Sequence, residues 1–163
     1  MLALKKASPL CALELDKEFL SVSEIAVKKI LVSACLAGEE CRYDCQARPN
    51  AEIIKQVVEG TAIPVCPEQL GGLPTPRTPA EIIGDKVIDK NGNDVSKEYQ
   101  NGAAEALRIA KEEGCTEAYL KAKSPMCGVG RIYDGSFSGR LIAGDGVFTK
   151  LLKSLGLSVH RVD

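Results

Sequence analysis

The chain has 163 residues, of which 45% are hydrophobic and 26% are charged, a composition typical of soluble globular proteins. This length predicts one domain with its own hydrophobic core. The formal net charge is −1 and no basic tail is present, which excludes bulk electrostatic capture of nucleic acid or a membrane surface. No apolar run reaches the roughly 20 residues of a membrane-spanning helix, and the N-terminus lacks a signal-peptide core. We therefore expect a cytoplasmic protein.

Residues 1–28 carry the least regular pattern and are interpreted as an N-terminal extension, with a short helix around Leu13–Leu20. The domain proper is expected over residues 29–163, where apolar periodicity becomes regular at Lys29.

Four short apolar runs alternate with three amphipathic segments after Lys29. Asn50 is a suitable N-cap, and Pro64 indicates that its strand is irregular or near a sheet edge. Strands are predicted over 29–34, 61–66, 117–123 and 157–162, helices over 51–59, 96–113 and 146–155, mostly loop over 67–84 and 124–146, and a tight turn at Asn91–Gly92.

This alternation of strands and helices predicts an α/β fold. We expect a single Rossmann-like domain with an open, mainly parallel sheet flanked by helices, in which right-handed crossovers place later strands beside the first one.

Three of the seven cysteines lie at or just beyond the ends of predicted strands: Cys35, Cys66 and Cys127. Because the carboxyl ends of parallel strands meet at one edge of the sheet, these three residues are expected to converge there. Cysteine is also a common buried core residue, so packing without metal remains an alternative for each of them.

The ligand chemistry of such a group points to a soft metal or an iron–sulfur cluster. The chain has no CxxC pair of the kind that zinc sites use, and its one histidine, His160, is better explained as a partly exposed strand residue. Three cysteines on a 4Fe–4S cluster would leave one iron without a protein ligand, available as a Lewis acid.

Several strings resemble, in order, the signature of the thiouracil desulfidase family, an iron–sulfur-dependent bacterial family formerly a domain of unknown function. The strings are SACLAGEECRYD, PVCPEQLGGLPTPR, SPMCG and IYDGSFSG. The resemblance implies that Cys35, Cys66 and Cys127 hold a 4Fe–4S cluster, whose free iron takes up the sulfur of a thiolated pyrimidine such as 2-thiouracil.

The resemblance also implies catalytic side chains. Ser124 matches the serine of the family's S-P-x-C motif, and Glu68 is the best local candidate for a proton-carrying glutamate, with Asp44 and Asp134 as other candidates. Cys45 occupies a position where similar strings carry glycine, at some cost in backbone freedom.

The expected partner is a small thiolated nucleobase or nucleotide. Arg42, Tyr43, Arg77 and Arg131 flank the cysteine loops; each alone is better explained as ordinary surface or loop packing, whereas together they would suit an anionic substrate.

Two other functions remain open. One is a thiol or persulfide enzyme with Cys127 as nucleophile and Cys41 or Cys45 as its resolving partner. The other is a module that binds a cluster without catalysis. In the leading interpretation Cys41 and Cys45 are thiols that lie beside the site or have no role in it.

Overall fold

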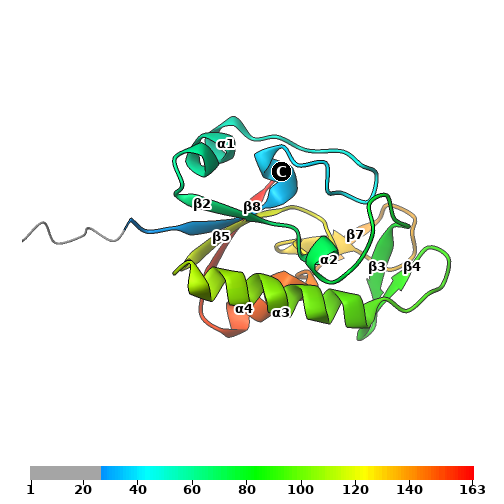
Figure 1. Cartoon of the computed structure of the whole chain (residues 1–163). Coiled ribbons are helices and arrows are strands. Elements are labelled where there is room, and N and C mark those ends of the chain that lie inside the picture. Colours follow the sequence, from blue (N-terminus) through cyan, green and yellow to red (C-terminus); the bar gives the residue numbers. More distant parts are fainter. Residues whose placement is uncertain (1–26) are drawn as a thin grey trace, which may run out of the picture.

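The computed structural model describes residues 27–163 (Figure 1). The helix predicted over Leu13–Leu20 lies outside these residues, as does all of the expected N-terminal extension except Val27 and Lys28. Among the described helices, none is long and apolar enough to cross a membrane.

The centre of the fold is a four-stranded parallel sheet in the order β2-β1-β5-β8. Of the strands in this sheet, the second and third in chain order (β2 and β5) flank the first (β1), as the crossover rule predicts. Pro64 lies on β2 at the edge of the sheet. A proline is tolerated there because its lack of an N–H breaks no hydrogen bond between strands. The strands are β1 (Ile30–Ser33), β2 (Ala62–Val65), β5 (Glu117–Lys121) and β8 (Ser158–Val162).

Helices cover both faces of this sheet, which confirms the predicted α/β architecture. Figure 1 shows α1 (Ala51–Val58) on one side and both α3 (Ser96–Glu112) and α4 (Val147–Ser154) on the other. Because side chains alternate along a strand, Leu31 packs in the core with α3 and α4, whereas its neighbour Val32 packs in the core with α1. The two apolar faces of β1 thus fix the three-layer arrangement.

The segment 67–84, predicted to be mostly loop, also contains two regular elements. It contains the short helix α2 (Pro67–Leu70) and the strand β3 (Ala80–Ile83), which pairs antiparallel with β4 (Lys86–Asp89). Both elements were missed because this segment is rich in proline, which usually indicates loop. Proline is nevertheless favoured in the first turn of a helix, and here it only flanks the strand.

The tight turn predicted at Asn91–Gly92 is present, but it is not the turn that joins this hairpin. The strands are joined at Gly84–Asp85, whereas Asn91–Gly92 lies in the turn after β4, where the Asp89 carboxylate accepts the Asn91 and Asn93 amides. Likewise, the loop predicted over 124–146 contains a second two-stranded hairpin of β6 (Arg131–Tyr133) and β7 (Leu141–Ala143). Strands this short carry too few residues for a periodic signal.

Two glycines allow α2 to lie directly on α3. A Cβ at Gly71 would lie 2.0 Å from the Glu98 carbonyl oxygen, and a Cβ at Gly102 would lie 1.8 Å from that of Pro67. Only glycine permits this approach. It fixes α2, which carries Glu68, against the helix that carries Tyr99.

Candidate metal centre

The three predicted ligand cysteines converge at the carboxyl edge of the sheet. Cys35 lies in the 3-10 helix η1 (Ala34–Ala37) directly after β1, Cys66 precedes α2 after β2, and Cys127 lies in the turn after β5. All three line one cavity of about 580 Å³. The order of strands, and not the spacing in sequence, brings these thiols together.

A fourth cysteine, Cys41, lines the same cavity and is only 4% exposed. The Cys66 thiol lies 3.7 Å from the Cys41 carbonyl oxygen. Cys45 is exposed and lies outside the cavity, with a positive φ of 56°, as expected where glycine would be favourable. The loop of residues 35–45 therefore contributes two thiols to the cavity.

The surroundings of Cys41, Cys66 and Cys127 favour protonated thiols. Contact with the Cys35 thiol raises the pKa of Cys41 to about 11. Contact with Cys41, together with burial, raises the pKa of Cys66, and burial raises the pKa of Cys127. Burial penalises a thiolate, whereas a bound metal ion deprotonates the thiols that coordinate it.

Ser124 organises the turn that presents Cys127. Its Oγ accepts hydrogen bonds from the backbone N–H groups of Met126, at 3.0 Å, and Cys127, at 3.1 Å. The Thr149 hydroxyl of α4 donates to the Cys127 carbonyl oxygen at 2.9 Å. The turn is thus tied both to its own serine and to the helix behind it.

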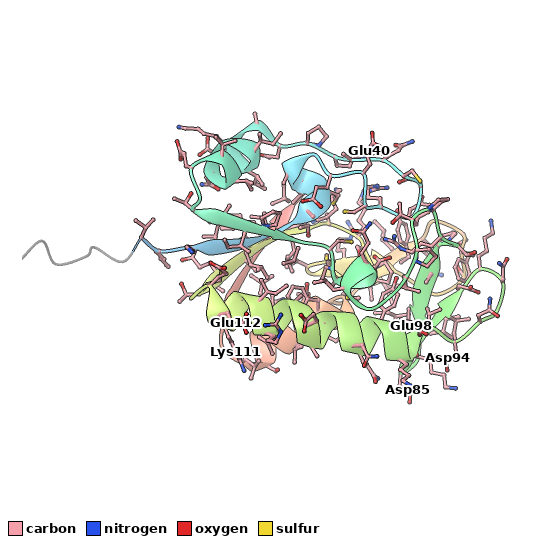
Figure 2. The ribbon with its side chains drawn as sticks, in the orientation of Figure 1. Glu40, Asp85, Asp94, Glu98, Lys111 and Glu112 are labelled. Carbon is pink, nitrogen blue, oxygen red and sulfur yellow. The ribbon has the colours of Figure 1, made fainter. Side chains whose placement is uncertain are left out.

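Glu68 lines the cavity in an ion pair with Arg77, whose Nε donates to Glu68 Oε2 at 2.6 Å. The same guanidinium donates through Nη2 to the Cys41 carbonyl oxygen at 3.0 Å. Tyr99 lies beside them, and burial, reinforced by the Glu68 charge, raises the pKa of its hydroxyl well above the usual value. Figure 2 shows Glu98, the residue before Tyr99, at the end of α3 nearest the β3–β4 hairpin, opposite Lys111 and Glu112.

Not every residue predicted from sequence reaches the cavity. Arg42 and Tyr43 line it. Asp44 lies outside it and pairs with Arg42 at 3.2 Å. Asp134 and Arg131 also lie outside, and the Asp134 carboxylate accepts a hydrogen bond from the Ser136 amide. Neither aspartate is therefore placed to serve the site directly.

His160 is an exposed residue of β8 whose ring stacks on Tyr119 at a centroid distance of 4.6 Å. It does not line the cavity. The prediction of a strand residue rather than a ligand agrees with this placement.

Several cavity residues were missed by sequence reasoning, although Tyr133 and Phe137 lie within the IYDGSFSG string. Six cationic side chains line the cavity against two acidic ones, so that its charge suits an anionic ligand. The missed residues are Arg48, Glu81, Lys90, Tyr99, Lys121, Lys123, Tyr133 and Phe137. Lys121 and Lys123 also carried a signal, since they lie at the end of the predicted strand 117–123, shortly before Cys127.

The donor set of the cavity suits an iron–sulfur cluster. Thiolates are the ligands of such clusters, and four cysteines and no histidine line the cavity. Within residues 27–163, no three His, Cys, Asp or Glu side chains are close enough together to hold a single metal ion. A cluster distributes its protein ligands over several irons, so it does not need such a compact group.

The chain is similar to known proteins over most of its length. Residues 30–163 match the model of the 2-thiouracil desulfurase family. The protein YbbK of Bacillus subtilis (strain 168) is 46% identical over 140 residues, which cover 80% of this chain and 93% of YbbK.

A solved structure of the [4Fe-4S]-dependent thiouracil desulfidase TudS resembles the fold, with a TM-score of 0.79 and 45% identity. The match covers 82% of this chain and 90% of TudS. The family resemblance found in the sequence and the desulfidase class of enzyme that it implied are confirmed by these matches. The chain belongs to the 2-thiouracil desulfurase family.

Proposed function

We propose that the protein removes sulfur from a small thiolated pyrimidine such as 2-thiouracil, using a 4Fe–4S cluster held by Cys35, Cys66 and Cys127. The observation that carries this proposal is the convergence of these cysteines, from three separate strand ends, on one cavity. When bound, a cluster with one iron free of protein ligands supplies a Lewis acid for a thiocarbonyl sulfur.

The protein side chains supply the proton transfers. The Glu68 carboxylate lines the cavity, and Arg77 holds it in place, so we assign it the role of taking a proton from the attacking water. Replacement of sulfur by the oxygen of water needs no external electrons, and the products are the oxo-pyrimidine and sulfide.

Ser124 is assigned the donation of a hydrogen bond to the substrate. Two backbone N–H groups already occupy its oxygen, which leaves the hydroxyl hydrogen free to point toward a ligand in the cavity. A donor fixed in this way stabilises negative charge that develops on the substrate.

The cationic lining extends the proposal to nucleotides. Lys121 ends β5, Lys123 follows it on the way to Ser124, and Arg42 lines the same cavity from the loop after β1. A thiolated nucleotide would place its phosphate among such side chains. Burial lowers the pKa of Lys121, which indicates that its ammonium group is partly enclosed.

The thiol or persulfide alternative receives less support. A nucleophilic cysteine needs an accessible thiolate, but Cys127 is buried and burial raises its pKa. Cys45, one candidate resolving residue, is exposed outside the cavity.

The proposal is tested by sulfide release from 2-thiouracil, with protein reconstituted anaerobically with iron and sulfide. We expect stoichiometric sulfide and uracil, and loss of both products in Cys66→Ala. A protein that binds the cluster but releases no sulfide from thiouracil or its nucleotides would instead support a cluster-binding module.

A further inference from the structure

Glu81 is a buried carboxylate in the cavity for which the proposed chemistry has no use. It lies on β3, is 7% exposed, and lines the cavity with the cysteines. Among residues 27–163 no cationic group lies within ion-pair distance of it, in contrast to Glu68, which Arg77 neutralises. An enclosed carboxylate is costly without hydrogen-bond donors, so this placement calls for a partner.

The protein supplies one donor and leaves one oxygen available. The backbone N–H of Phe137 donates to Glu81 Oε2 at 3.0 Å. No described residue donates a hydrogen bond to Oε1. This atom is not fully enclosed, since Glu98 Oε2 is the only fully enclosed side-chain oxygen or nitrogen without a partner among the described residues. Oε1 therefore retains some exposed surface, and because Glu81 lines the cavity, we take this oxygen as an acceptor available to a ligand there.

The loop around Phe137, which holds this carboxylate, has an energetically unfavourable backbone conformation. Phe137 has a φ of 56°, which bulky side chains rarely adopt, and Gly135 leaves no room for a Cβ, which would lie 2.8 Å from the Ile82 carbonyl oxygen. The loop thus packs tightly against β3. Phe137 and Tyr133 line the cavity beside Glu81 and offer aromatic surfaces for a planar ring.

We propose that Glu81 Oε1 accepts an N–H of the thiolated pyrimidine and selects bases that carry that hydrogen. This inference rests on the proposed desulfidase function and names how that site recognises its substrate. In 2-thiouracil an N–H group flanks the thiocarbonyl carbon on either side. A carboxylate acceptor for one of them orients the ring and gives a strong, charge-assisted hydrogen bond.

The test compares wild-type protein, Glu81→Ala and Glu81→Gln, each loaded with the cluster, on 2-thiouracil and its 1-methyl and 3-methyl derivatives. Wild type should discriminate at least tenfold in kcat/KM against one of the methylated bases. Glu81→Ala should raise KM for 2-thiouracil at least about tenfold, with a smaller change in kcat, and should lose that discrimination. Glu81→Gln, which keeps an acceptor oxygen without the charge, should fall between the two.

Binding of uracil, measured by isothermal titration calorimetry, provides a readout that does not depend on turnover. We expect about tenfold weaker binding to Glu81→Ala, with unchanged iron content and absorption spectrum. Glu105→Gln, at an exposed position of α3, serves as the control and should behave as wild type.

The outcomes separate the two proposals. Sulfide release by wild type, with unchanged KM, discrimination and uracil affinity in Glu81→Ala, overturns the role of Glu81 alone. A fall in kcat without a change in KM or uracil affinity also overturns it. Failure of loaded wild type to release sulfide from any of these bases overturns the desulfidase proposal and the inference that rests on it.

Discussion

Arg77 and Glu68 form an ion pair that joins two of the loops that present cysteines. Arg77 Nε lies 2.6 Å from Glu68 Oε2, and the two side chains are 6% and 16% exposed. The Arg77 backbone N–H also donates to the Tyr43 carbonyl oxygen at 3.1 Å, and its Nη2 donates to that of Cys41. One arginine therefore positions the proposed proton carrier and the loop after β1 together.

Arg77→Met should destabilise the fold. Removing one partner of a nearly buried ion pair leaves a carboxylate without compensation, which costs about 3 kcal/mol. The measurement is the free energy of unfolding in denaturant under anaerobic conditions. Arg108→Met removes two exposed pairs, with Glu105 and Glu112, and should cost about 1 kcal/mol or less, so equal losses in the two variants would contradict this account.

Ser124→Ala should lower both stability and turnover. The variant leaves the Met126 and Cys127 amides without their acceptor, which costs about 1 kcal/mol of unfolding free energy, and it removes the proposed donor, which should lower kcat about a hundredfold.

Ser124→Thr is the matched control, because it keeps the hydroxyl. It should retain the stability and most of the turnover. Normal kcat in the alanine variant would exclude a catalytic role for the hydroxyl, whatever its effect on stability.

Gly102→Ala should separate α2 from α3. The new Cβ would meet the Pro67 carbonyl oxygen at 1.8 Å, so the helices must move apart, at a cost of about 2 kcal/mol or more. The thermal midpoint and the free energy of unfolding measure this cost. Asn101→Ala, at the neighbouring exposed position of the same helix, should leave both values nearly unchanged.

Cys45→Gly should stabilise the protein. Cys45 adopts a φ of 56°, which costs a residue with a side chain about 1 kcal/mol relative to glycine. The free energy of unfolding should therefore rise by about that amount in Cys45→Gly. Cys45→Ala keeps the same strain and should give no such gain; equal effects of the two substitutions would assign the change to loss of the thiol.

The sheet and its three long helices could be predicted because their signals are local. The Asn50 side chain accepts the amides of Glu52 and Ile53, as its position before an amphipathic run suggested. Strand order then placed Cys35, Cys66 and Cys127 at one edge. Periodicity and capping residues are properties of short stretches of sequence, so these predictions required no knowledge of tertiary contacts.

The two hairpins and much of the cavity wall could not be predicted. Strands of three or four residues, such as β6, show no clear alternation, and pairing with a distant segment decides their existence. Glu81 reads as a surface glutamate in sequence, and only packing of the Phe137 loop encloses it. Cys41 likewise reaches the cavity because its loop folds back toward Arg77.

The most direct test of the central claim is the iron and acid-labile sulfide content of anaerobically reconstituted cysteine variants. About four irons and four sulfides per chain are expected in wild type and in Cys41→Ala and Cys45→Ala, with loss of the cluster in Cys35→Ala, Cys66→Ala and Cys127→Ala. Retention of a full complement of iron in any of these last three, or its loss in Cys41→Ala, would contradict the proposed ligand set.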